Sequence, residues 1–237
     1  MAILRFRQRA RREDLGLASR EFDALWRLHS PAKIQAFVNA IPANHELHGE
    51  TVHSAREVLR HREAHCIEAA LLAACALWIH GEPPLVMHLD CALSDHPHVV
   101  ALFRRGRCWG AISKSNGVWL RYREPVYLNL RELAMSYFHE YFDRQGRKTL
   151  RSYSGAYDLR RIDHAQWVTN SDACWQAHDR LAALRHYPLL SAAQVRALAR
   201  RDPFERESAK LVQHPRPTSA GTDGRTRGSP RASPDDP

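Results

Sequence analysis

Cys66 occupies the position in this sequence that is best suited to covalent chemistry. It follows a charged stretch, residues 60–65, and precedes an apolar run, residues 67–79, that predicts a helix. A thiol at a helix N-terminus faces unpaired backbone N–H groups and the positive end of the helix dipole, and both favour the thiolate. We therefore predict that Cys66 is a nucleophile.

His98 is the candidate partner of this thiol. It opens an apolar run that predicts a strand, and a second such run follows after a turn centred on Arg105 and Gly106. A hairpin with that centre places His98 opposite Ser113 on one face of the two strands. The sequence therefore predicts a cysteine at a helix tip, a histidine on a strand, and a polar residue beside the histidine.

The third position decides how well such a pair can work. A thiol enzyme needs an imidazole that takes the thiol proton and later passes it to the leaving amine, and the other ring nitrogen must be held in the right tautomer. Ser113 can accept a hydrogen bond from His98 but contributes no charge. Asp95, three residues before His98, and Asn116, three residues after Ser113, are alternative third residues.

Further candidates surround the thiol. The backbone N–H of Cys66 and a group from His65 are the candidate donors to an oxyanion. Glu68 is interpreted as a first-turn carboxylate that favours the helix dipole, on the side of the helix away from the thiol. Lys114 and Arg121 are candidate substrate-binding residues that could line a groove for an acidic substrate or a carboxylate terminus, and a solvated basic face explains them equally well.

The order of these motifs resembles the transglutaminase-like superfamily, within the papain-like group of thiol enzymes. The resemblance covers roughly residues 50–122, and the matching segments are 65–72, 81–85, 98–102 and 109–113. It implies an α+β fold in which the Cys-bearing helix packs on a small antiparallel sheet, with other helices around it. It also implies an acyl-enzyme formed at Cys66 from an amide or peptide, with no cofactor.

One departure from the family leaves two functions open. The family usually has Asp, or Asn in papain-like members, where this chain has Ser113. The first function is a thiol enzyme that hydrolyses an amide or peptide or transfers its acyl group. The alternative is a catalytically degenerate domain of the same fold that serves as a protein- or peptide-binding module.

Apolar periodicity places these motifs on an α+β framework. Helical spacing recurs in seven segments, which are 14–30, 32–41, 54–60, 67–79, 130–142, 171–186 and 191–200. Strands are predicted at 85–89, 98–103, 108–113 and 117–122, the last ended by Pro125, with an edge strand at 148–153. Because neighbouring strands are joined by short loops, we expect an antiparallel sheet.

Length and composition indicate one folded domain. The chain has 237 residues, 44% of them hydrophobic, which is enough for a single core. We expect a basic N-terminal segment over 1–13 and one transglutaminase-like domain over 14–202. We also expect a disordered tail over 203–237, which from His214 onward is mostly Pro, Ser, Thr, Gly, Arg and Asp.

Charge and hydropathy restrict the partners. The net charge is +9, yet no run of Lys or Arg alternates with aromatic residues as in proteins that bind single-stranded nucleic acid. The sequence therefore argues against a nucleic-acid partner, whereas a peptide or amide substrate, possibly an acidic one, is what the resemblance implies. The longest apolar stretch, residues 69–79, is too short to span a membrane. No feature of the sequence indicates an oligomeric state.

The cysteines and histidines give little support to disulfides or metals. The five cysteines are odd in number and irregularly spaced, and no Cys-x-x-Cys pair occurs. A metal site at His88, His96 and His98 has no further ligand at a fixed spacing, so we expect no metal. Because the N-terminus has no apolar segment of signal-peptide length, we expect a cytoplasmic protein.

Overall fold

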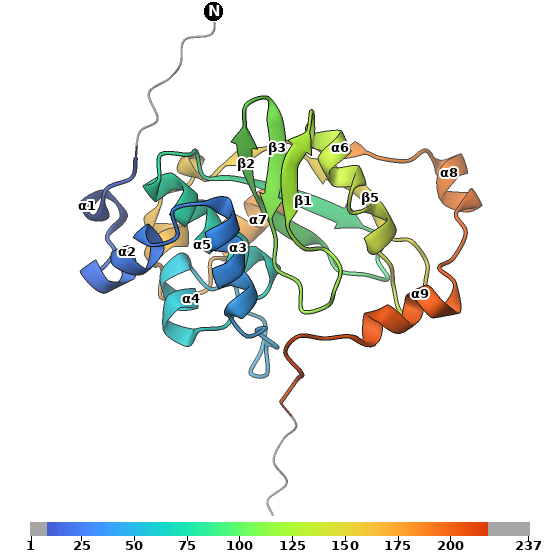
Figure 1. Cartoon of the computed structure of the whole chain (residues 1–237), viewed down its shortest axis with the longest axis horizontal. Helices are drawn as coiled ribbons and strands as arrows, with labels where there is room; N and C mark the ends of the chain where they lie inside the picture. The colour runs from blue at the N-terminus through green and yellow to red at the C-terminus, as the bar shows by residue number, and fades with distance from the viewer. Residues whose placement is uncertain (1–8, 218–237) are drawn as a thin grey trace, which may run out of the picture.

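The computed structural model describes residues 9–217, which form helices around an antiparallel sheet (Figure 1). The sheet has the strand order β4-β3-β2-β1-β5-β7, and β6 pairs with the first residues of β1. Every pairing between named strands is antiparallel, as predicted. The strands are Leu85–Cys91 (β1), His98–Arg105 (β2), Cys108–Ile112 (β3), Arg123–Tyr127 (β4), Leu150–Ser154 (β5), Tyr157–Asp158 (β6) and His186–Pro188 (β7).

Helices lie on both sides of this sheet. The α-helices are Arg12–Leu15 (α1), Ser19–Trp26 (α2), Pro31–Ala40 (α3), Ala55–His61 (α4), Cys66–Ile79 (α5), Leu130–Met135 (α6), Trp175–Ala182 (α7), Ala192–Ala197 (α8) and Pro203–Glu207 (α9). Short 3-10 or π turns are Phe138–Glu140 (η1), Leu159–Arg161 (η2), Ala165–Thr169 (η3) and Ser208–Lys210 (η4). Within residues 9–217, no helix has the length and apolarity needed to cross a bilayer.

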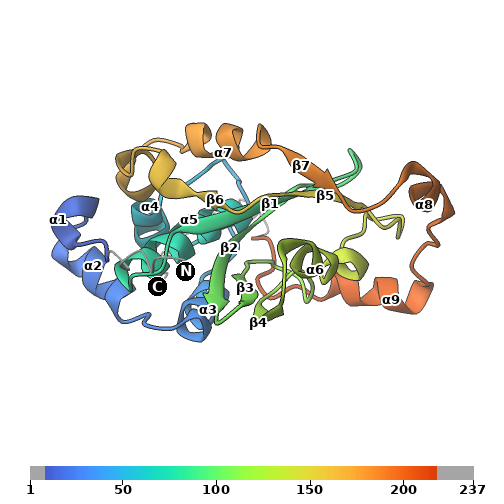
Figure 2. The same ribbon diagram turned by 90° about the horizontal axis from the view of Figure 1, so that it is seen from above.

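The middle of the sheet is covered on both faces, with α5 on one side and α6 on the other (Figure 2). Alternate residues of β2 enter the two cores. Val99 and Ala101 pack in the core that contains α5, whereas Val100 and Leu102 pack in the core that contains α6. Residues 98–103 are therefore all buried, which explains why this strand reads as a continuous apolar run.

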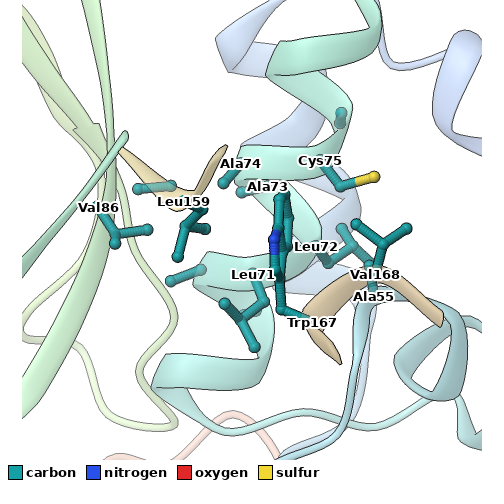
Figure 3. Close-up of a cluster of buried hydrophobic side chains, with 14 of the residues drawn as sticks. Ala55, Leu71, Leu72, Ala73, Ala74, Cys75, Val86, Leu159, Trp167 and Val168 are labelled. Carbon is teal, nitrogen blue, oxygen red and sulfur yellow. The ribbon is translucent and has the colours of Figure 1, made fainter. Parts of the chain in front are cut away.

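Helix α5 is the spine of the larger core. Every residue from Ile67 to Ile79 except Trp78 is buried, as expected for a helix that is apolar all round. Figure 3 shows this helix between Val86 and Leu159 on one side and Val168 on the other. Because the helix is enclosed in this way, its N-terminal residue has a fixed position relative to the sheet.

The hairpin of β2 and β3 has a different turn from the predicted one. Its two-residue loop is Gly106 and Arg107, rather than Arg105 and Gly106. Since the turn centre moves by one residue, every cross-strand pairing shifts by two. An even shift preserves the face on which each side chain lies, so His98 and Ser113 remain on one face although they are not directly opposite.

The prediction of a strand over 117–122 that ends before Pro125 is wrong. Strand β4 is Arg123–Tyr127 and contains this proline. Strand β4 lies at the edge of the sheet, and an edge strand tolerates a proline, which has no N–H to donate to a neighbouring strand. Residues 113–122 instead form the loop between β3 and β4, and Leu120 in that loop has a φ of +56°.

The chain termini and two helices also differ from expectation. Residues 203–217 were predicted to be disordered, but they form α9, η4 and a segment that pairs with the loop after β3, while 218–237 lie outside the described residues. The first eight residues of the predicted basic segment also lie outside them. The predicted helix 14–30 is divided by Gly16, at a φ of +66°, into α1 and α2, and the helix predicted over 130–142 ends at Met135.

Candidate active site

Cys66 is the first residue of α5 and is partly exposed. Burial raises the pKa of Cys75, in the middle of the same helix, to about 12. Burial acts in the same direction on Cys66, but the charges and hydrogen bonds of His98 and His65 outweigh it and lower the pKa of the Cys66 thiol well below its usual value. The structure therefore brings the predicted Cys66 and His98 together, and it adds a second imidazole.

Ser113 fixes the tautomer of His98. Its hydroxyl lies 2.7 Å from His98 Nε2 and donates to Leu120 O at 2.5 Å. A hydroxyl has only one proton to donate, so His98 Nε2 must be the donor in its bond to Ser113. In the neutral ring this leaves His98 Nδ1 as the nitrogen that can take the proton of Cys66.

Leu120 is held so that its carbonyl can receive this contact. Its φ of +56° lies in the left-handed region, which is unfavourable for a branched side chain. The Leu120 N–H donates to Glu140 Oε2 at 2.8 Å, and Glu140 forms an ion pair with Arg123 of β4. A backbone carbonyl thus orients His98 through Ser113, where a carboxylate would do so directly.

His65, the N-cap residue of α5, is the second imidazole at the thiol. Its Nε2 lies 2.9 Å from Thr51 O and 3.3 Å from Glu68 Oε1, which leaves Nδ1 for Cys66. Burial lowers the pKa of His65, but hydrogen bonding and charge from Cys66, with contributions from Glu68 and Thr51, raise it to about 9. At neutral pH His65 is therefore an imidazolium beside the thiol.

Glu68 is fully buried and anchors this arrangement. Burial raises the pKa of its carboxyl, but the charge of His65 and several hydrogen bonds outweigh burial and lower it. Four donors surround the carboxylate: His65 N at 2.9 Å, His53 N at 2.9 Å, Thr51 Oγ1 at 2.8 Å and Asn44 Nδ2 at 3.1 Å. Glu68 is thus connected to the site through His65, which its interpretation as a dipole-favouring carboxylate missed.

One signal in the sequence could have found Glu68. The helix that follows Cys66 is apolar on every side, so a carboxylate in its first turn is expected to be buried as well. A buried carboxylate needs hydrogen-bond donors, and a Glu three residues after the N-cap can accept from the N-cap backbone N–H. The loop donors Asn44 and Thr51 carry no such signal in the sequence.

The side chains of the two alternative third residues, Asp95 and Asn116, form hydrogen bonds with groups other than His98. Asp95 accepts a hydrogen bond from Thr149 Oγ1 at 2.5 Å. The side-chain amide of Asn116 bonds the backbone of His214. The structure therefore brings Ser113, rather than Asp95 or Asn116, to the imidazole.

Lys114 does not line a groove. It is buried, and its Nζ donates to Val38 O at 2.9 Å and to Ile41 O at 2.6 Å, at the C-terminal end of α3. Burial, with a smaller effect of Arg121, lowers the pKa of its ammonium to about 8. Arg121 is partly exposed and donates to Gln213 Oε1 at 2.8 Å, so only the second of these two candidates can meet a ligand.

The histidines considered for a metal site have other contacts. His88 Nδ1 lies 2.8 Å from His186 Nε2, and His98 contacts Ser113. In the part of the chain that the structure describes, no group of three or more His, Cys, Asp or Glu residues is placed to hold a metal ion.

Comparison with known proteins identified no relative of this chain. No protein-family model matches the chain, and no curated protein matches it. The chemistry of the site is therefore inferred from its own residues.

Proposed function

We propose that this protein is a transglutaminase-like thiol enzyme that acts on an amide or peptide bond. The supporting observation is a thiol at a helix N-terminus whose pKa two imidazoles, His65 and His98, hold low. Burial raises the pKa of three other thiols to about 12: Cys75, Cys91 and Cys174. A shift in the opposite direction at one partly exposed thiol is typical of a functional site.

In the first half of the reaction, the Cys66 thiolate attacks the substrate carbonyl carbon and a C–S bond forms. The backbone N–H of Cys66 and, as a second donor, His65 stabilise the resulting oxyanion. Imidazolium His98 then donates its Nδ1 proton to the leaving nitrogen while Nε2 remains bonded to Ser113. The C–N bond breaks, the amine leaves, and a thioester remains on Cys66.

In the second half, water or an amine enters and attacks the thioester. Neutral His98 takes the proton of this nucleophile on Nδ1 as the new C–O or C–N bond forms. The C–S bond breaks and the Cys66 thiolate is regenerated. Water gives a carboxylic acid and an amine gives a new amide, and neither outcome requires a cofactor in these steps.

His65, held by Glu68, supplies positive charge beside the thiolate that does not depend on Ser113. A carboxylate in the third position would stabilise the imidazolium of His98, and a serine hydroxyl does so only through its dipole. The imidazolium of His65 lies beside the thiol and is held by Glu68, with a pKa of about 9. Positive charge therefore remains next to the thiolate whether or not His98 carries its second proton.

The second candidate function is a catalytically degenerate domain that binds a protein or peptide. Two observations favour it. The residue that orients His98 is uncharged, and the segment after α9 already lies bound along the loop that follows Ser113. This candidate keeps the binding surface and gives up the acyl transfer.

Alkylation by iodoacetamide, followed peptide by peptide, separates the two functions. Cys108 is partly exposed, as Cys66 is, and serves as the reference thiol in the same molecule. At pH 6.5 an ordinary thiol with a pKa near 8.5 is about 1% ionised, so an ionised Cys66 should react at least about ten times faster, even though low-pKa thiolates are less nucleophilic. A Cys66 rate no higher than that of Cys108 would reject the enzyme and leave the binding module.

Amide and peptide substrates then identify the reaction. Wild-type protein should release the amine from at least one amide or peptide, and Cys66→Ala should not. Cys108→Ala serves as the matched control and should keep the activity. Retention of turnover by Cys66→Ala would show that another group carries out the reaction.

A further inference from the structure

The segment after η4, residues 211–217, binds the surface of the same chain as a peptide ligand would. Val212 forms an isolated antiparallel bridge with Gly117, and the N–H of Gln213 donates to Asn116 O at 2.8 Å. In Figure 1 this part of the chain runs from α9 beneath the sheet toward the loop after α3. We call residues 211–217 the C-terminal segment.

Asn116 holds the main chain of this segment with both ends of its side-chain amide. Its Nδ2 donates to His214 O at 2.8 Å, and its Oδ1 accepts from His214 N at 2.8 Å. In this paired contact, Asn116 binds the backbone N–H and C=O of His214 and forms no hydrogen bond with the His214 side chain. Recognition of this kind accepts many sequences but requires a free backbone N–H.

The opposite side of the contact comes from the helical part of the molecule. His45 Nε2 lies 3.1 Å from His214 O, and Gln213 Nε2 donates to Asn39 O at 3.0 Å. Arg121, on the sheet side, donates to the side-chain oxygen Oε1 of Gln213 at 2.8 Å. The C-terminal segment therefore lies between loops of the helical part and the sheet.

Polar contacts rather than apolar burial hold this segment. Leu211 is 61% exposed and Val212 is 49% exposed. Further along the segment, His214, Pro215 and Pro217 line a pocket of about 250 Å³ together with the loop of residues 42–48. A segment that buries so little apolar surface can detach at low cost and be replaced by another peptide.

The loops that hold this segment also position the candidate active site. Asn116 follows Ser113 by three residues in the same loop. On the other side, Asn44 is adjacent to His45 and donates to Glu68 at 3.1 Å. A peptide held by these loops therefore lies against the two segments that orient His98 and His65.

We propose that the groove formed by Asn39, His45, Asn116 and Arg121 is a binding site for an extended peptide, and that the C-terminal segment occupies it as an intramolecular competitor. The proposal deepens the proposed function and in that respect rests on it, because it names an extended peptide as the ligand of the loops beside the candidate active site. Its binding step does not depend on the reactivity of Cys66. A tethered competitor acts at a high effective concentration, so a free peptide binds the wild-type chain only weakly.

The test uses the full-length chain and a fluorescent, acetylated peptide with the sequence of residues 211–217. The variant Gln213→Ala/His214→Pro removes the side-chain contacts of Gln213 and the backbone N–H that Asn116 accepts, so it releases the tethered segment. Fluorescence anisotropy should show at least tenfold tighter peptide binding to this variant than to wild type. Adding Asn116→Leu to the variant should abolish the gain.

Modified peptides provide a control that leaves the protein unchanged. N-methylation at Gln213 and His214 removes the two N–H donors to Asn116 and should weaken binding to the release variant at least tenfold. N-methylation at Leu211 is the matched control, because its N–H donates within the chain to Ser208 O rather than to the groove. That peptide should bind as the unmodified one does.

Three results would overturn the proposal. They are equal peptide affinity of wild type and the release variant, no saturable binding to the release variant while circular dichroism shows it folded, and equal binding of the two N-methylated peptides. If Cys66 is unreactive but the release variant binds the peptide as expected, the groove proposal holds and the proposed enzymatic function is rejected. If Cys66 reacts fast and any of the three results is found, only the groove proposal fails.

Discussion

Ser113 holds His98 through its hydroxyl, which accepts a hydrogen bond from His98 Nε2 and donates one to the Leu120 carbonyl. In serine proteases, loss of the orienting carboxylate lowers turnover by about four orders of magnitude, mainly because the wrong tautomer forms. Here the tautomer is set without a carboxylate, since the serine proton is already committed to a carbonyl. Positive charge beside the thiol is contributed by His65, which Glu68 holds.

Glu68→Gln tests that charge at the scale of one residue. The amide removes the negative charge that helps to hold the pKa of His65 at about 9, so this pKa should fall. With less positive charge beside the thiolate, the pKa of Cys66 should rise, and the pH profile of its alkylation should move to higher pH by about one unit. The profile is measured with iodoacetamide between pH 4 and pH 10.

Glu50→Gln is the matched control for this change, because Glu50 is exposed and lies in the loop before α4. Its profile should coincide with that of wild type. A Glu68→Gln variant that remains folded and keeps the wild-type profile would show that His65 does not act on the thiol through Glu68.

Among the elements, the β2–β3 hairpin and β4 are brought together by a glycine. A Cβ on Gly110 would lie 2.4 Å from Phe103 Cζ and 2.8 Å from Arg123 O. Phe103 in turn stacks on Tyr122, which directly precedes β4. The close approach positions β4 and the end of the loop before it, and that loop contains both Leu120 and Ser113.

Gly110→Ala should therefore disturb both stability and the site. The added methyl group must displace the backbone of β4, and we expect a loss of about 1–3 kcal/mol in the free energy of unfolding. Urea denaturation measures this loss. Gly155→Ala is the matched control, since no atom lies within 4 Å of the Cβ that it would add. Equal stability of the two variants would contradict the packing argument.

At the scale of the whole molecule, the site lies where two parts of the fold meet. Cys66 and His65 come from the start of α5, whereas His98 and Ser113 come from β2 and the loop after β3. Packing of α5 on the sheet determines the distance between Cys66 and His98. Histidines also link distant segments of this assembly, because His88 of β1 contacts His186 of β7.

The His88–His186 contact should make stability depend on pH. Burial, followed by the charge of His186, lowers the pKa of His88 to about 4 in the folded state, against about 6.5 in an unfolded chain. A lowered folded-state pKa gives stability that is complete above pH 6.5 and is lost as the pH falls toward 4. The shift corresponds to about 3 kcal/mol in the free energy of unfolding.

Urea denaturation at pH 7 and pH 4.5 measures this effect as a difference between variants. His88→Gln should lose less stability than wild type when the pH is lowered over this range. His48→Gln, at an exposed position, should behave as wild type does. Equal pH dependence of wild type and His88→Gln would show that His88 does not titrate as its buried position implies.

The sequence by itself determined the features that depend on local patterns. The apolar run after Cys66 defined α5 and placed the thiol at its tip, because a helix that is apolar all round must be buried. Alternation with a period of two placed His98 and Ser113 on one face of a hairpin. That relation survived the error in the turn, since a shift of two residues does not change the face.

Only the tertiary structure decided the contacts between irregular segments far apart in the sequence. The donors to Glu68 include Asn44 and Thr51, and the partner of Asn116 is His214. Such loops have no periodicity that would report which residues they face. The helix and the ordered segment within residues 203–217 were not predicted for the same reason. Polar contacts with the rest of the molecule hold these residues, and composition alone does not record contacts that form only after the chain has folded.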